Sequence, residues 1–213
     1  MNNLIGFIVS VIYIASILVI SMFLSKKGEE ISRKFVHIML SNIWFIYLFF
    51  IDSLVVACIL PALFVLINIL SYKFKLIKSM ERENNDGFGT IYYAISILII
   101  SAFSYYLNIP MIGTLGVLVM GYGDGFAAII GKGVNSPKYR IGNTTKILAG
   151  SLTMLIVSMI ISCIVLNLLG AEYFVLKAIC ISVLATILEA ISIKGLDNIS
   201  VPVILTALVY LMV

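Results

Sequence analysis

Residues 147–169 read ILAGSLTMLIVSMIISCIVLNLL, an apolar run without one charged side chain. A helix needs about 20 such residues to cross the hydrocarbon core of a bilayer, so this run predicts a membrane span. The rest of the chain contains further runs of the same character. The eight predicted spans are residues 4–24, 35–51, 54–70, 91–107, 112–130, 147–169, 173–193 and 199–213, of which the last is short.

The composition of the whole chain supports this prediction. Apolar residues make up 62% of it and charged residues only 11%, with a mean hydropathy of +1.17. A soluble domain carries about 25% charged residues, so lipid must be the solvent for most of this surface. No linker or shift of composition divides the chain. We therefore expect an all-α, polytopic integral membrane protein with about eight transmembrane helices, in a single transmembrane domain over residues 1–213.

The basic residues predict the orientation of these spans. Lys177 lies in the seventh span, and the other Lys and Arg residues fall in four alternate connections, residues 25–34, 71–90, 131–146 and 194–198. Cytosolic loops carry such an excess of Lys and Arg. We expect a plasma-membrane protein with both termini outside and its long loops in the cytosol. Topology also explains the net charge of +4 without a nucleic-acid partner.

The first span and the cysteines have simpler interpretations. The leader Met1-Asn2-Asn3 has no basic residue, so the first span is expected to be an anchor and not a cleaved signal peptide. Three cysteines sit inside apolar runs without metal or disulfide spacing, and we interpret them as buried packing thiols. They are Cys58, Cys163 and Cys180.

Two carboxylates, Asp124 and Glu189, fall inside predicted spans. A charge in hydrocarbon costs several kcal/mol unless it is paired, bound to a cation or reached by water. At about 1.5 Å of rise per residue, both lie roughly 7–10 Å below the cytosolic helix ends. Their similar depth on separate helices suits a shared cation site. The alternative is that each acid pairs with a lysine or with a neighbouring helix.

Three glycines surround the first of these acids in the sequence Gly121-Tyr122-Gly123-Asp124-Gly125. Each glycine weakens a helix interior by about 1 kcal/mol relative to alanine, so something must approach this backbone closely. Gly121 and Gly125 also form a GxxxG pair, which permits close helix packing in lipid. Ligand binding and helix packing therefore both account for them.

The connection that follows, residues 131–151, carries four cations, several glycines and hydroxyls, and no acid. Such a segment suits a polyphosphate, with Thr144 or Thr145 capping the next helix, whose free amides favour an anion. Membrane orientation alone would also make it basic. The only histidine, His37, follows Arg33 and Lys34, and this group suits phosphate or hydroxyl contact better than metal ligation. The turn-rich residues 84–90 are interpreted either as a plain loop or as a functional segment.

Five segments together resemble the membrane-bound polyprenol kinase family, which includes dolichol kinase, phytol kinase and a CTP-dependent diacylglycerol kinase. They are Arg33-Lys34-x-x-His37, Gly87-x-Gly89-Thr90-Ile91-Tyr92-Tyr93, Gly123-Asp124-Gly125-x-Ala127-x-x-x-Gly131, Lys146-x-x-Ala149-Gly150-Ser151 and Glu189-Ala190-x-x-x-x-Gly195-Leu196-Asp197-Asn198-x-x-Val201-Pro202. They follow the family's order, and the chain is most similar to the phytol kinase branch. Phytol kinases often show two Asp residues before the Asn, whereas this chain has one, Asp197.

The resemblance implies CTP as phosphoryl donor, Mg²⁺ as cofactor and a long-chain lipid alcohol as acceptor: a polyprenol, a phytol-like alcohol or diacylglycerol. We assign Asp124 to the cation, with Glu189 or Asp197 as second ligand or as base, and Lys146 to the transferring phosphates. Asn198 would orient a phosphate or the acceptor hydroxyl. The further nucleotide-binding candidates are Gly123, Gly125, Gly131, Lys138, Arg140, Gly150, Ser151, Asn198, His37, Arg33 and Lys34.

Other functions are consistent with parts of this pattern. The Gly-Asp-Gly and Lys…Gly-Ser segments are similar in style to CDP-diacylglycerol synthase, so a cytidylyltransferase that makes a CDP-lipid is the nearest alternative. Intramembrane acids and glycine-broken helices are also typical of small transporters, although no inverted repeat is evident. A structural subunit would have no use for the polar cluster. The expected partners are membrane lipids and the lipid alcohol substrate, and the sequence leaves open whether the chain forms a homo-oligomer.

Overall fold

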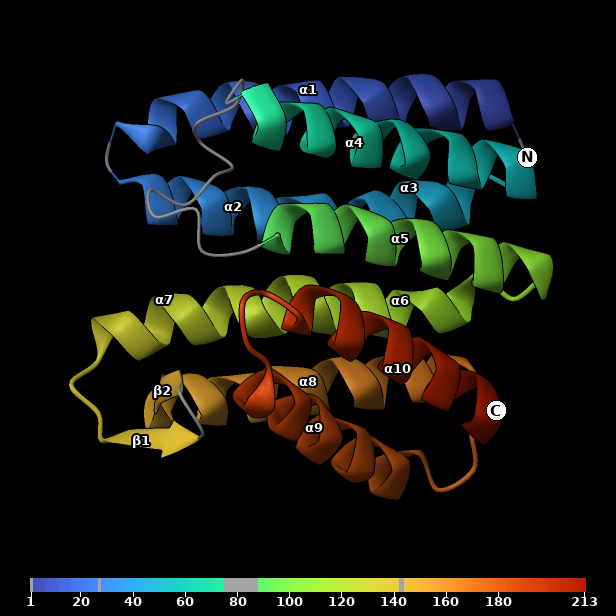
Figure 1. The fold of residues 1–213 in the computed structure, drawn as a ribbon. Coiled ribbons are helices and arrows are strands. Elements are labelled where there is room, and N and C mark those ends of the chain that lie inside the picture. The colour runs from blue at the N-terminus through green and yellow to red at the C-terminus, as the bar shows by residue number, and fades with distance from the viewer. Residues whose placement is uncertain (1, 27, 75–87, 142–143) are drawn as a thin grey trace.

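The computed structural model describes residues 2–26, 28–74, 88–141 and 144–213. These residues form a bundle of long and short helices and a pair of short β-strands (Figure 1). The first half comprises α1 Asn3–Ser25, α2 Glu29–Ser41, α3 Ile43–Phe50, α4 Leu54–Phe74 and α5 Gly89–Tyr106. The second half comprises α6 Met111–Leu118, the π-helix η2 Val119–Asp124, α7 Gly125–Gly133, β1 Lys138–Ile141, β2 Thr144–Ile147, α8 Leu148–Leu168, α9 Phe174–Ile191 and α10 Asp197–Met212.

Every predicted span coincides with helix, which confirms a polytopic helical membrane protein. Within the described residues, six helical segments are long and apolar enough to cross a membrane: α1, α4, α5, the continuous α6–η2–α7 helix, α8 and α9. The predicted span 35–51 is divided between α2 and α3, which meet at Asn42. The last predicted span is the 16-residue helix α10.

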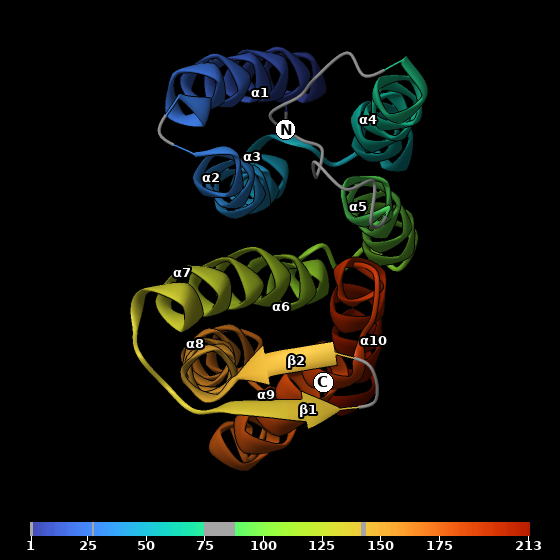
Figure 2. The same cartoon turned by 60° about the vertical axis from the view of Figure 1, so that its left-hand side comes forward.

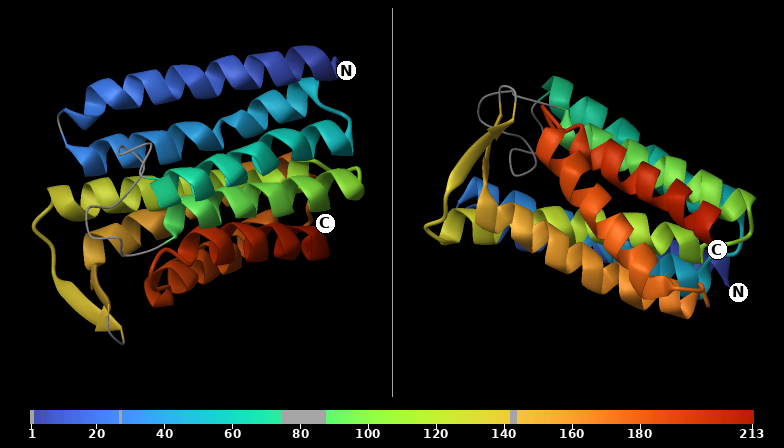
Figure 3. Two further views of the ribbon diagram at one scale, coloured as in Figure 1. Left: turned by 45° about the horizontal axis from the view of Figure 1, so that its top comes forward. Right: turned by 90° about the horizontal axis from the view of Figure 1, so that it is seen from below.

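The described fold is all-α, as predicted, apart from the short strands of residues 138–141 and 144–147. There β1 and β2 pair antiparallel, with Lys138 opposite Ile147 and Ile141 opposite Thr144. The β-branched residues of these strands favour strand, although the sequence pattern was interpreted as a loop. Figure 3 shows the hairpin projecting beyond the helix ends on one side of the bundle.

The helix formed by α6, η2 and α7 is the centre of the molecule. In its most apolar window 72% of the residues are buried, against 17% in α1. Helices α2, α8 and α10 pack around it, as Figure 2 shows in part. Asp124, the last residue of η2, is thereby held inside the protein and away from lipid.

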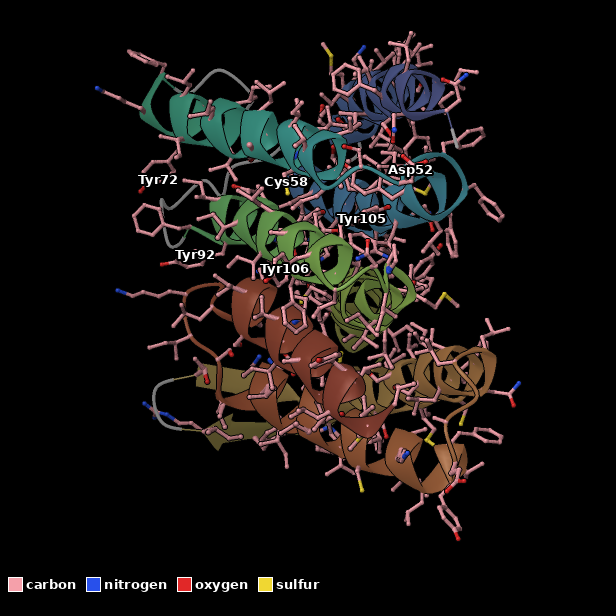
Figure 4. All side chains as sticks on the ribbon, turned by 90° about the vertical axis from the view of Figure 1, so that its right-hand side faces the viewer. Asp52, Cys58, Tyr72, Tyr92, Tyr105 and Tyr106 are labelled. Carbon is pink, nitrogen blue, oxygen red and sulfur yellow. The ribbon has the colours of Figure 1, made fainter. Side chains whose placement is uncertain are left out.

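Both termini lie at the end of the bundle opposite the hairpin (Figure 1). Several polar contacts stabilise that end. The Asn3 amide donates to Asp52 at 2.6 Å and keeps the pKa of that carboxyl below its usual range. Tyr105, labelled in Figure 4, donates from α5 to the backbone oxygen of Tyr47 in α3 at 3.0 Å.

The cysteines only partly match their interpretation as packing thiols. All three are free, and Cys58 and Cys163 are half-buried. Cys180 is exposed on α9, so its interpretation as a buried packing thiol is wrong. An apolar run in a membrane helix does not by itself say which face meets protein, because lipid accepts the same side chains.

Candidate active site

The glycines around Asp124 allow neighbouring helices to approach. A Cβ atom on Gly121 would lie 2.3 Å from the Cβ of Ser41, and one on Gly125 would lie 2.2 Å from the Cγ1 of Ile38, both on α2. A Cβ on Gly123 would lie 2.6 Å from the Sδ of Met154 on α8. The packing interpretation therefore accounts for all three. Gly123 and Gly125, expected at the nucleotide, are not among the residues that line the cavity described below.

The segment that carries Asp124 is a π-helix, η2. Such turns are rare and are frequently found at functional sites. The phenol of Tyr122, in the same turn, donates to the side chain of Asn42 at 2.7 Å, where α2 meets α3. This hydrogen bond fixes the π-helix η2 against Asn42, where α2 ends and α3 begins. Asp124, at the end of η2, therefore lies opposite the first turns of α2.

Asp124 forms an ion pair with Lys34. The Lys34 Nζ lies 2.6 Å from the Asp124 Oδ2, and the two side chains are only 7% and 13% exposed. The His37 Nε2 lies 3.3 Å from the same oxygen. Lys34 was expected in a connection, but it lies in α2, which begins at Glu29. Because Lys34 and His37 are three residues apart on that helix, both reach the same carboxylate.

A second ion pair joins the hairpin to α9. Lys146, at the third position of β2, extends its side chain to Glu189, where Nζ contacts Oε1 and also donates to the backbone oxygen at 2.7 Å. The pair is mostly buried. The two intramembrane acids are thus both paired with lysines, as the alternative interpretation expected. This does not exclude ligand binding, because both pairs line one cavity.

The two ion pairs border a cavity of about 370 Å³ at the hairpin end of the bundle. Its charged lining comprises four cationic and four acidic side chains, a balance that suits a polyphosphate together with a cation better than a bare anion. The lining residues are Glu30, Arg33, Lys34, Asp124, Ala127, Ala128, Gly131, Lys132, Thr145, Lys146, Ile147, Gly150, Ser151, Glu189 and Asp197.

Most of the predicted site residues meet in this cavity although they come from α2, η2, α7, β2, α8, α9 and α10. Lys138 and Arg140 do not line it. They alternate along β1 with Tyr139, whose hydroxyl bonds to the Ser151 hydroxyl at the cavity wall. In a strand, successive side chains point to opposite faces, so Lys138 and Arg140 lie on the face opposite Tyr139.

Glu30 was not singled out from the sequence. It contacts Arg33 at 2.7 Å and Lys132 at 3.5 Å, so it bridges α2 and α7 at the cavity. Its place three residues before Arg33 is a helical pairing signal that could have been found.

The prediction that Thr144 or Thr145 caps the next helix is wrong. Both residues lie in β2, and α8 begins after Ile147, which forms no side-chain cap hydrogen bond. Thr145 lines the cavity from the strand instead.

The start of α10 brings two sequence segments together. A Cβ on Gly195, whose φ is +83°, would lie 2.8 Å from the Cα of Gly89 at the start of α5. Next to them the Asn198 amide donates to the Gly195 oxygen at 3.0 Å and to the Asp197 Oδ1 at 3.2 Å. Asp197 faces the large cavity, while Asn198 lines a small neighbouring one together with His37.

The three predicted metal ligands, Asp124, Glu189 and Asp197, all line the large cavity. Among the described residues, however, no three His, Cys, Asp or Glu side chains are grouped closely enough to hold a metal ion by themselves. Mg²⁺ usually binds through one or two carboxylates with waters and substrate phosphates completing its shell. The donor set therefore fits a cation that arrives with a nucleotide.

The fold and the cavity define a polytopic membrane protein with a charged cavity at one end of its helices. The chain is 30% identical over 181 residues to the phytol kinase of Synechocystis, a match that covers 84% of this chain and 78% of that relative. The chain belongs to the phytol kinase family, whose members are phosphotransferases with an alcohol acceptor. This confirms the resemblance noted in the sequence.

Plant relatives give weaker matches of the same kind. A probable chloroplastic phytol kinase 1 of rice is 30% identical over 209 residues, and one of soybean is 35% identical over 148 residues. The matches cover 86% and 63% of this chain but only 65% and 48% of those relatives. No protein-family model matches the chain, and no solved structure gives a significant match.

Proposed function

We propose that this protein transfers the γ-phosphoryl group of CTP to the hydroxyl of a long-chain lipid alcohol of the phytol type. The observation that carries the proposal is the single cavity bordered by Lys34–Asp124 and Lys146–Glu189. The family resemblance supplies CTP and the acceptor class. In the reaction the acceptor oxygen bonds to the γ-phosphorus, the bond from that phosphorus to the CDP oxygen breaks, and the hydroxyl proton passes to a carboxylate, Glu189 or Asp197.

The two ion pairs suggest how the cavity takes up its donor. Without ligand, each lysine neutralises a buried carboxylate, which would otherwise be costly. When magnesium nucleotide binds, Asp124 would hold the cation, and Lys34 and Lys146 would turn to the phosphates. Mg²⁺ would neutralise charge on the transferring group. Phosphoryl transfer depends mainly on such positioning and neutralisation, and the cavity has the residues for both.

We further propose eight membrane crossings, with α2–α3 and α10 completing the six longer helices, and both termini outside. The termini share one end of the bundle (Figure 1), as an even number of crossings requires. The basic connections and the cavity share the other end, which the positive-inside rule assigns to the cytosol. We place the protein in the plasma membrane, although the plant relatives are described as chloroplastic.

The test is a reconstituted assay with purified protein, CTP or ATP labelled in the γ-phosphate, and a panel comprising phytol, a polyprenol and diacylglycerol. We expect a labelled lipid monophosphate and CDP, dependent on Mg²⁺ and faster with CTP than with ATP. Release of pyrophosphate with a CDP-lipid product would instead identify a cytidylyltransferase. No chemical change of any acceptor would leave the transporter interpretation standing.

A further inference from the structure

A second, small cavity of about 30 Å³ lies beside the large one. Arg33 lines both cavities, so the two adjoin at the cytosolic turn of α2. The small cavity differs from the large one in having an apolar wall. Its lining comprises Arg33, Val36, His37 and Leu40 of α2, Phe64 of α4, Gly89, Thr90 and Tyr93 of α5, and Asn198 of α10.

The polar side of the small cavity faces the candidate cation site. The His37 Nε2 is buried without a hydrogen-bond partner within the described residues and lies 3.3 Å from the Asp124 Oδ2. Its ring packs against Tyr93, with centroids 4.4 Å apart, so its position is fixed. The nitrogen faces the Asp124 carboxylate at ion-pair distance but forms no hydrogen bond with it, so a hydroxyl group that bonds to the His37 nitrogen would complete an open polar contact. Asn198 offers a second polar group from the opposite wall.

The apolar side consists of Val36, Leu40 and Phe64. It lies at the seam between α2 and α4, which is the more loosely packed side, because α2 packs mainly on α1 and η2 whereas α4 packs mainly on α5. At the same end, a ring cluster of Tyr72, Phe88 and Tyr92 joins α4 to α5, and Figure 4 shows Tyr72 and Tyr92 on one outer edge. Among the described helices, the α2–α4 seam is the side through which a prenyl chain bound here would reach lipid.

The size of the cavity limits what can enter. About 10–15 Å³ of such space holds one water molecule, so 30 Å³ takes roughly two groups of that size, such as a hydroxyl and its methylene. A terminal CH₂OH on a single chain fits these dimensions. The next carbon meets the apolar wall of Val36, Leu40 and Phe64. A hydrocarbon chain suits that wall, whereas the adjacent carbon of diacylglycerol carries an ester, whose polar atoms would find no partner there.

We propose that this small cavity is the acceptor subsite, in which His37 and Asn198 hold the hydroxyl of a single-chain primary alcohol and Phe64 contacts the start of its tail. The inference rests on the proposed function and adds where the acceptor binds and why diacylglycerol is excluded. The hydroxyl then lies on the side of His37 that faces Asp124, next to the phosphates that the large cavity would hold.

The first experiment tests binding without requiring turnover. A long-chain primary alcohol that carries a photoactivatable diazirine near its hydroxyl is irradiated with the reconstituted protein, and labelled peptides are mapped by mass spectrometry. We expect labels on α2 around residues 36–40 and on α4 around residue 64, reduced by excess phytol but not by diacylglycerol. Labels confined to other helices would overturn the subsite.

The second experiment uses kinetics. Phe64→Ala removes the tail contact and widens the cavity, so the KM for the alcohol should rise about threefold to tenfold, because each 1.4 kcal/mol of lost contact is a factor of ten. Activity with diacylglycerol relative to phytol should increase, and the KM for CTP should stay unchanged. Phe64→Leu, which keeps the core filled, should show the same trend less strongly.

The matched control is Phe49→Ala, the same truncation at a side chain of α3 that is 73% exposed. It should leave both KM values and the acceptor preference as in the parent protein. An equal response of the Phe64 and Phe49 variants would overturn the subsite while leaving the kinase function intact. Labels on α2 and α4 with no lipid phosphorylation would do the reverse, supporting the alcohol site and contradicting the proposed function.

Discussion

Mutations of Asp124 and Lys34 can distinguish the role of this ion pair in catalysis from its role in stability. Asp124→Asn keeps the size of the side chain and a hydrogen-bond acceptor for Lys34, but it removes the charge that would hold the cation. We expect turnover to fall by about a hundredfold or more, as when one electrostatic contact to a transferring group is lost. The variant should still fold, with a moderately lower melting temperature, because Lys34 keeps a hydrogen-bond acceptor but loses its counter-charge. The measurements are lipid phosphorylation over a range of Mg²⁺ concentrations and thermal unfolding in detergent.

The partner mutation should be the more destabilising of the two, because it leaves the Asp124 carboxylate without its lysine donor. Lys34→Met removes the cation from a buried pair and leaves Asp124 uncompensated, since Lys34 is only 5% exposed. Breaking a buried pair from one side costs about 3–5 kcal/mol, so this variant should unfold at a clearly lower temperature than Asp124→Asn. Near-parental activity of Asp124→Asn at all Mg²⁺ concentrations would remove Asp124 from the active site.

A mutation of Lys146 tests why the connection before α8 is basic. Its basic residues could serve to bind phosphate or only to orient the membrane helices. A hydrogen bond to a charged group contributes about 1.5–3 kcal/mol, so Lys146→Ala should lower kcat/KM by about tenfold to a few hundredfold. Lys73→Ala, a control on α4 at the same end of the bundle but outside the cavity lining, should have little effect. Equal, small effects of the two variants would exclude Lys146 from the phosphate site.

At the residue scale, the sequence predicted which residue types form the candidate site better than it predicted which residues contact one another. The cost of a charge in lipid singled out Asp124 and Glu189, and both line the cavity. Their lysine partners were less easily assigned. Lys34 and Asp124 are separated by 90 positions, and only the packing of α2 against η2 brings them together. His37 was recognised as polar, but its place between the two cavities depends on tertiary structure.

At the element scale, the glycines of η2 give a direct test of packing. In Gly121→Ala the new Cβ would lie 2.3 Å from the Cβ of Ser41, so α2 must move away from η2. Overpacking of this kind costs about 1–3 kcal/mol, which we expect as a lower melting temperature and, because Lys34 moves with α2, reduced turnover. The readouts are detergent melting curves and lipid phosphorylation.

Gly133→Ala is the matched control, since a Cβ there meets nothing within 4 Å. It ends α7, where alanine favours helix more than glycine does, so its stability should equal or slightly exceed that of the parent. If Gly121→Ala melts no lower than Gly133→Ala, the glycines of η2 are not required for packing, and direct contact with a ligand becomes their better explanation.

The sequence predicted the long helices well and the short elements poorly. Hydropathy determines spans such as α8, because any helix in lipid must bury its backbone polar groups internally. The break at Asn42 and the strands of residues 138–141 and 144–147 carry no such constraint. Each strand has four residues and is fixed by contacts such as that of Tyr139 with Ser151 and that of Lys146 with Glu189, which no local pattern reveals.

At the scale of the whole molecule, the proposed function depends on which side of the membrane the cavity faces. CTP is a cytosolic nucleotide with several negative charges, and it cannot cross the bilayer to reach a site on the outer face. The hairpin lies at one end of the bundle and the termini at the other (Figure 1), and residues of β2 line the cavity. Orientation is therefore a condition of the kinase function and can be tested without any assay of activity.

The test uses single cysteines in a variant whose Cys58, Cys163 and Cys180 are replaced by serine. Lys138→Cys on β1 and Lys194→Cys before α10 report on the hairpin end, and Glu172→Cys between α8 and α9 reports on the opposite end. In sealed, right-side-out vesicles a membrane-impermeant maleimide should label position 172 directly but positions 138 and 194 only after permeabilisation. Labelling of 138 or 194 in sealed vesicles would place the cavity outside, and the protein could then not use cytosolic CTP.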